Sequence, residues 1–221
     1  MTPVDERLLL FRRLSAATGR PAGGGSDAEP APPIPLAEDG DRLDRFGRAF
    51  EAAGGVLFHG PPESAMHDLA EELRAAGVTE LFHPPADVEA CRVAEALVPF
   101  GPFALTTGEA VRAGGSAVTA GFRTAEAGIA ETGTVVETSA GGNTFLPGLL
   151  ADVHVAIVPA CRVVESMDEA LIPYAADPPR NISFLTGPSK TADIEQTLTV
   201  GAHGPKKAIA LLLPPEGPKK E

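Results

Sequence analysis

The chain has 221 residues and a formal net charge of −12. A hydrophobic content of 43% and a mean hydropathy of +0.04 are typical of a globular protein and exclude a wholly disordered chain. No apolar run reaches the ~18 residues that a membrane span needs, and acidic residues stand where a signal peptide carries basic ones. We therefore expect a cytoplasmic protein without a membrane span.

The negative charge is concentrated in the middle of the chain. Residues 51–180 contain 18 acidic and 6 basic side chains, a net charge of −12, whereas the segments on either side are nearly neutral. Binding to nucleic acid or to an anionic membrane needs a basic surface that neutralises phosphates. The charge distribution offers none, so we expect no nucleic-acid partner.

The N-terminal part divides into two segments before the compact domain begins. Residues 1–18 space leucine and phenylalanine side chains as an amphipathic helix does. Residues 19–40 are rich in proline and glycine, which is typical of a linker. We predict an N-terminal helix tethered to a domain of residues 41–214, followed by a polar tail of residues 215–221.

The first half of the predicted domain alternates between helical and strand patterns. Helical spacing indicates helices over residues 41–53, 61–76 and 85–97. Short apolar runs indicate buried strands over residues 56–58 and 79–82. Alternation of this kind favours an α/β fold with parallel strands.

The second half of the domain is richer in strand patterns. One helix and one further helical turn or two are indicated over residues 164–172 and 192–198. Apolar or β-rich runs predict strands over residues 117–122, 127–130, 134–138, 153–159, 182–186 and 208–213.

Cofactor signatures are weak throughout the sequence. The two cysteines, Cys91 and Cys161, are far apart and form no CxxC motif, so this chain alone cannot supply the ligands of a Cys₄ cluster. No HExxH motif and no GxGxxG motif after a predicted strand is present. We expect no metal and no cofactor bound by this chain.

The first candidate site is the segment Ala130-Glu131-Thr132-Gly133-Thr134 between two predicted strands. Gly133 permits an unusual backbone angle or the close approach of a ligand, and Glu131 is placed at a strand end. The structural alternative is a hairpin turn in which Glu131 only faces water.

The second candidate site follows the strand over residues 182–186. The loop Gly187-Pro188-Ser189-Lys190-Thr191 combines backbone N–H groups with hydroxyl and ammonium donors, as an anion-binding loop does. It is not a Walker A loop, because Ser189 stands where that motif has glycine. On the local pattern alone we favour a helix N-cap at Ser189 or Thr191, with Asp193 and Glu195 in the first turn.

The third candidate site is the segment Gly201-Ala202-His203-Gly204-Pro205. A histidine between small residues on a loop suits proton transfer near neutral pH. His154, in contrast, lies within an apolar strand pattern and is expected to point into the core.

These segments occur in a distinctive order. Four segments in this order together resemble the LUD domain, in particular the lactate utilization protein C family. They are the sequence from Ile129 to Thr134, the strand after Leu146-Pro147, the run from Thr186 to Glu195 and the segment from Gly201 to Pro205. One departure is Lys190, where the family more often has arginine, which binds anions through two parallel hydrogen bonds.

The resemblance implies a fold and a role. It implies a single Rossmann-like three-layer α/β domain similar to the fold shared by ribose-5-phosphate isomerase and CoA-transferases. It also implies an accessory subunit of a system that oxidises L-lactate to pyruvate, with iron–sulfur clusters carried by partner proteins.

The resemblance also indicates the residues of a site. Glu131 is expected to act as a base or a ligand-binding carboxylate, and His203 as a proton shuttle. The three loops are expected to form a cleft for a small carboxylate, and its ligand-binding residues are expected to be Thr132, Gly133, Thr134, Gly187, Ser189, Lys190, Thr191, Asp193, Glu195 and Gly204.

Three alternatives remain open from the sequence. The chain could be a free-standing isomerase- or CoA-transferase-like enzyme that binds a small carboxylate or phosphate, although the acidic middle region opposes anions. It could be a metal hydrolase that uses His203 and His154. It could also be a stable fold whose loops are caps and turns only.

Overall fold

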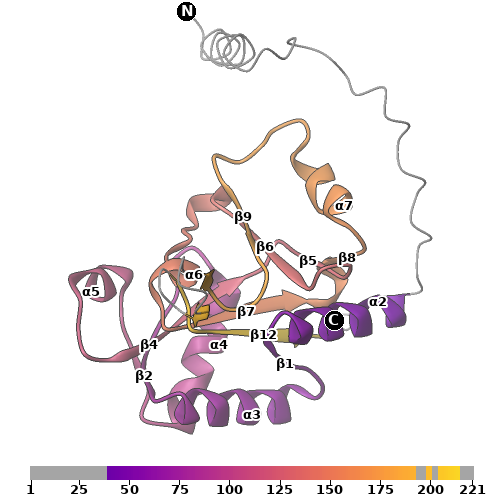
Figure 1. Cartoon of the computed structure of the whole chain (residues 1–221). Coiled ribbons are helices and arrows are strands. Elements are labelled where there is room, and N and C mark those ends of the chain that lie inside the picture. The colour runs from indigo at the N-terminus through magenta and orange to yellow at the C-terminus, as the bar shows by residue number, and fades with distance from the viewer. Residues whose placement is uncertain (1–38, 193–197, 201–203, 215–221) are drawn as a thin grey trace, which may run out of the picture. The chain divides into compact units, whose positions relative to one another are not determined.

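The structure is a computed structural model that describes residues 39–192, 198–200 and 204–214 (Figure 1). These residues fall within one compact unit, Leu36–Glu221. The predicted N-terminal helix, most of the predicted linker and the predicted polar tail lie outside the described residues.

The centre of the fold is a six-stranded sheet in which every neighbouring pair is parallel. In the order β1-β12-β7-β4-β2-β3, its strands are Val56–Phe58, Lys207–Leu213, Val153–Pro159, Val118–Thr124, Val78–Phe82 and Ala104–Leu105. The strand that comes last in the sequence, β12, lies between β1 and β7, and it pairs with β7 along its whole length.

One face of this sheet is covered by two helices, α3 (Pro62–Ala75) and α4 (Val88–Leu97) (Figure 1). Alternate side chains along a strand point to opposite faces, and the set that includes Phe122, Val155 and Ile157 packs against the leucines of these helices. Asp87 fixes the start of α4, because its carboxylate accepts a hydrogen bond of 3.1 Å from the backbone N–H of Ala90.

The opposite face packs on α2 (Asp39–Ala52) and on a second sheet. Phe46 and Phe50 of α2 stack with their ring centroids 5.8 Å apart, and they lie in one apolar cluster with Ala156 and Val158 of β7. The helices α3 and α4, the parallel sheet, and the layer of α2 with the second sheet thus form three layers.

The second sheet has four strands in the order β8-β5-β6-β9. They are β8 (Val163–Val164), β5 (Ala127–Ile129), β6 (Thr134–Thr138) and β9 (Ile182–Leu185). The turn from residue 130 to residue 133 joins β5 and β6, which pair antiparallel.

Short elements complete the described fold. The helix α6 (Leu146–Leu150) packs against β4, where a Cβ added to Gly121 would lie 2.6 Å from the backbone of Pro147. The other short elements are η1 (Val98–Phe100), α5 (Gly108–Ala113), η2 (Ala140–Gly142), η3 (Ala160–Arg162), α7 (Met167–Leu171), η4 (Ile172–Tyr174), β10 (Lys190–Ala192) and β11 (Leu198–Val200).

The predicted α/β fold class is confirmed, and the strands are found within a few residues of their predicted bounds. The helical turns predicted over residues 192–198 are wrong at both ends, because Ala192 and Leu198 belong to the antiparallel pair β10 and β11. The helix predicted from residue 164 begins later, at Met167. Ser166 caps it, because its hydroxyl accepts a hydrogen bond from the backbone N–H of Glu169. None of the described helices is both long and apolar enough to cross a membrane.

Candidate functional site

The turn between β5 and β6 is held tightly at its glycine and leaves its acidic side chain in solvent. Gly133 has a φ of 62°, and a Cβ added there would lie 2.1 Å from the backbone nitrogen of Phe50 in α2. Only glycine fits such a close contact between two backbones. Glu131 is exposed, and its backbone N–H donates to the carbonyl oxygen of Glu165 at 3.1 Å.

A chain of hydroxyl groups connects this turn to the second predicted loop. The Oγ1 atoms of Thr132 and Thr134 lie 2.7 Å apart, and the Oγ1 of Thr134 lies 2.7 Å from that of Thr186. Thr132 and Thr186 are exposed and Thr134 is buried, so a buried hydroxyl joins two residues at the surface. The two loops are therefore neighbours, as the predicted site requires.

The loop after β9 is fixed against the end of α2. Gly187 has a φ of 72°, and a Cβ added there would lie 2.5 Å from the carbonyl oxygen of Ala53. The Lys190 ammonium donates to the same carbonyl oxygen at 2.7 Å. A cation at the carboxyl end of a helix is favourable, so Lys190 stabilises the contact between this loop and α2.

The helix cap favoured from the local pattern at Ser189 or Thr191 is wrong. The chain enters the strand β10 at Lys190, and Thr191 pairs with Thr199 of β11. The backbone N–H of Ser189 donates instead to the carbonyl oxygen of Pro205 at 2.9 Å.

The third predicted loop meets the second through its glycine. A Cβ added to Gly204 would lie 3.2 Å from the Cβ of Ser189. The described parts of the three predicted loops thus form one continuous region, which we call the loop region: residues 131–134, 186–190, and 204 and 205. His203, Asp193 and Glu195 lie outside the described residues.

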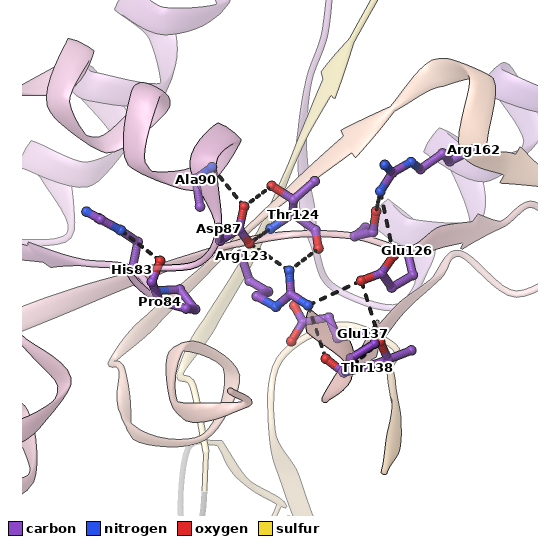
Figure 2. A network of polar contacts seen from close by, with 12 residues as sticks. His83, Pro84, Asp87, Ala90, Arg123, Thr124, Glu126, Glu137, Thr138 and Arg162 are labelled. Atoms are coloured by element: carbon purple, nitrogen blue, oxygen red, sulfur yellow. Dashed lines mark hydrogen bonds and ion pairs between the residues drawn. The ribbon is translucent and has the colours of Figure 1, made fainter. Parts of the chain in front are cut away.

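Sequence reasoning missed a second polar region, at the carboxyl end of β4. Arg123 is 1% exposed, and its Nη1 donates to Asp87 at 2.6 Å and to the carbonyl oxygen of Thr124 at 2.8 Å. Its Nη2 donates to the carbonyl oxygen of Thr138 at 3.1 Å and to Glu126 at 3.4 Å (Figure 2). We call these five residues the Arg123 centre.

The Asp87 carboxylate accepts four hydrogen bonds. Besides Arg123 and Ala90, it accepts from the hydroxyl of Thr124 at 2.6 Å and from its backbone N–H at 2.8 Å. Burial alone would raise the pKa of Asp87, but the hydrogen bonds from Thr124, Ala90 and Arg123 outweigh it and hold the pKa below its ordinary value. Asp87 is therefore a stable counter-charge for Arg123.

The position of the Arg123 centre in the fold is characteristic of ligand sites. After β2 the chain passes to α4 on one face of the parallel sheet, whereas after the adjacent β4 it passes to the second sheet on the other face. Ligands of open α/β sheets bind outside the carboxyl ends of strands at such a switch point. The Arg123 centre lies at this switch point.

A buried pair joins the two sheets nearby. His154 of β7 lies with its Nε2 2.8 Å from Oε1 of Glu137 on β6, and both side chains are almost fully buried. Oε2 of Glu137 has no hydrogen-bond partner among the described residues. The expectation that His154 points into the core is confirmed.

The sequence carried a signal for these buried groups, though not for their partners. Arg123 and His154 are single basic residues within otherwise uncharged strands. A charge in such a run needs a buried partner, but spacing does not say which. Across the described part of the chain, no group of three or more histidine, cysteine, aspartate and glutamate residues is arranged to hold a metal ion.

Comparison with known proteins gives a consistent result. A family model described as LUD domain matches residues 49–213. Lactate utilization protein C from Geobacillus thermodenitrificans is 39% identical over 99 residues, which are 42% of this chain and 41% of that protein. Lactate utilization protein C from Bacillus subtilis is 38% identical over 99 residues, with the same coverage. The matched segments thus span about two fifths of the length of these curated relatives.

A solved structure has the same fold. A DUF162 family protein from Deinococcus radiodurans superposes with a TM-score of 0.57 at 16% sequence identity, covering 80% of this chain and 99% of that chain. At this identity the likeness supports the fold alone.

Proposed function

Since the chain belongs to the LUD domain family, we propose that it takes part in lactate utilization. The observation that carries this proposal is its similarity to proteins named lactate utilization protein C. The specific role we propose is that of an accessory subunit in a system that oxidises L-lactate to pyruvate together with iron–sulfur partner proteins.

In this role the chain binds and orients a small carboxylate while its partners carry the electrons. Oxidation of lactate to pyruvate releases two electrons and two protons, and in our proposal the electrons pass to iron–sulfur clusters of the partners. The residues proposed to handle the ligand and a proton are Glu131 and His203. What supports the placement of Glu131 is a rigid turn that leaves its carboxylate in solvent.

The loop region supports the binding part of this role. The hydroxyl chain through Thr134 and the contacts of Gly133 and Gly187 with α2 fix two loops at one end of a helix. A fixed frame of this kind holds side chains in place at little entropic cost when a ligand binds.

The test is lactate-dependent dye reduction in extracts of source cells that lack the chain. Adding back the purified chain should restore the activity, and so should Glu71→Gln, a matched control at an exposed glutamate of α3. Glu131→Gln and His203→Ala should fail to restore it, with an unchanged melting temperature.

Two results would contradict the proposal in different ways. Full restoration by both Glu131→Gln and His203→Ala would show that the loop region is not the site. Unchanged dye reduction without the chain would remove the role in lactate oxidation, and stabilisation of the purified chain by CoA or a sugar phosphate would then favour the free-standing enzyme.

A further inference from the structure

The two carboxylates of the Arg123 centre are held very differently. Asp87 accepts contacts of 2.6, 2.6, 2.8 and 3.1 Å. Glu126 has contacts of only 3.4 Å with Arg123, 3.5 Å with Thr138 and 3.7 Å with Arg162. Hydrogen bonds between a guanidinium and a carboxylate usually measure about 2.7–2.9 Å, so Glu126 is loosely bound where Asp87 is tightly bound.

Only the side chain of Glu126 is loose. Its backbone N–H donates to the carbonyl oxygen of Val136 at 2.8 Å, which fixes the main chain to β6. The side chain is 26% exposed and therefore has a path to solvent, unlike that of Asp87. Rotation of the side chain alone can remove its carboxylate from the centre.

The groups around the Glu126 carboxylate are those that recognise a carboxylate in general. They comprise two guanidinium groups, from Arg123 and Arg162, and the hydroxyl of Thr138 (Figure 2). Arg123 also keeps its Nε–H without a partner among the described residues. Arg162 is 46% exposed, and Nη1 alone makes both its contacts within the described part of the chain. Each guanidinium thus retains donors for a further acceptor.

Tyr174 lies within electrostatic reach of the same position. Burial raises the pKa of Tyr174, the charge of Glu126 raises it further, and the charges of Arg162 and Arg123 lower it. Tyr174 is the only tyrosine of a chain that has no tryptophan, so its fluorescence reports on this region alone.

From this geometry we infer that the Arg123 centre is a binding site for a small monocarboxylate, whose place is taken in this structure by the side chain of Glu126. Asp87 and Glu126 balance the charges of Arg123 and Arg162. A monocarboxylate that replaces Glu126 preserves this balance, whereas a dianion such as phosphate adds a negative charge to an acidic part of the chain. The identification of the ligand as a 2-hydroxy acid such as L-lactate rests on the proposed function, with the Arg123 centre as a second carboxylate site apart from the loop region.

The test is a titration of the purified full chain with L-lactate, followed by the fluorescence of Tyr174. We expect a saturable change with lactate and none with inorganic phosphate at the same concentration. Glu126→Ala should tighten lactate binding by about tenfold, because the competing carboxylate is gone, and Glu126→Gln should tighten it less. Arg162→Gln should weaken binding by about tenfold, whereas Arg180→Gln, a control at an exposed arginine, should leave it unchanged.

Failure of this inference is distinguishable from failure of the proposed function. The inferred site is wrong if Tyr174 fluorescence does not respond to lactate in the wild type or in Glu126→Ala. It is also wrong if both Glu126 variants bind lactate with the wild-type affinity. Either result counts against the site even where dye reduction needs the chain. If lactate binds as expected but dye reduction does not depend on the chain, the carboxylate site stands and the role in lactate oxidation is wrong.

Discussion

At the carboxyl end of β4, Arg123 and Asp87 bury a full ion pair, whereas the turn before β6 buries a glycine and leaves the charge of Glu131 in water. The Arg123 centre is fixed by charge. The loop region is fixed mainly by backbone fit, with Gly133 and Gly187 packed against the end of α2. The difference teaches that a rigid site can be built around charges that are paired inside the fold or around a backbone fit that leaves a charged group in solvent.

The largest expected effect tests the backbone fit of the loop region. Gly133→Ala would place a Cβ 2.1 Å from the backbone nitrogen of Phe50, at a positive φ. We expect the free energy of unfolding to fall by more than about 4 kcal/mol, measured by urea denaturation.

The matched control for this substitution is Gly77→Ala. Gly77 has a similar φ of 75°, but an added Cβ would meet nothing within 4 Å. The backbone angle alone should cost about 1–2 kcal/mol. Equal losses for the two variants would show that contact with α2 does not fix the turn.

The next effect tests the charge of the Arg123 centre. Asp87→Asn leaves the buried guanidinium with only the loosely held Glu126 as counter-charge, and it should cost about 3 kcal/mol at neutral pH. Because the pKa of Asp87 is lowered in the folded state, its contribution is present above the unfolded pKa of about 3.9 and is lost as the pH falls through the folded value.

Urea denaturation across the acidic range measures this dependence. The wild type should lose stability towards low pH more steeply than Asp87→Asn does. The same pH dependence in both proteins would mean that Asp87 is not the charge that stabilises the centre.

A smaller effect tests the hydroxyl chain of the loop region. Thr134→Val removes the central hydroxyl and both of its hydrogen bonds, which should cost about 1–2 kcal/mol. Thr132→Val removes one bond at an exposed position and should cost less than half as much. Similar losses in thermal denaturation would indicate that the hydrogen bond between Thr134 and Thr186 adds no stability.

The smallest effect on stability, but a specific one, is expected at Glu126. Glu126→Gln removes a negative charge that raises the pKa of Tyr174, so that pKa should fall. The single tyrosine makes the phenolate absorbance unambiguous. Glu71→Gln on α3 is the control. If its titration curve moves as far as that of Glu126→Gln, the effect is not local to the Arg123 centre.

The parallel sheet was predictable because its longer strands are apolar runs that carry their own signal. β7 and β12 are nearly uninterrupted stretches of aliphatic residues. The segment around Thr191 has capping and acidic residues that predict a helix. Its described ends form strands instead, because Lys190–Ala192 pairs with Leu198–Val200, a contact that local sequence does not encode.

The candidate sites divide in the same way. The glycines of the loop region could be found from sequence, since a glycine between two strands marks a turn. The pairing of Asp87 with Arg123 could not, because the residues are 36 positions apart and meet only where β2 lies beside β4. β2 and β4 are neighbours in the sheet although β3 lies between them in the sequence, so only the assembled sheet shows that they are adjacent.

The position of β12 has a consequence for how the protein is made. β1 pairs only with β12 within the parallel sheet, and β7 also depends on β12 for one of its two neighbours. During synthesis, this sheet cannot close until residues 207–213 are available to pair. The facing edges of β1 and β7 then stay unpaired until β12 inserts between them, and unpaired strand edges expose a chain to aggregation before it has folded.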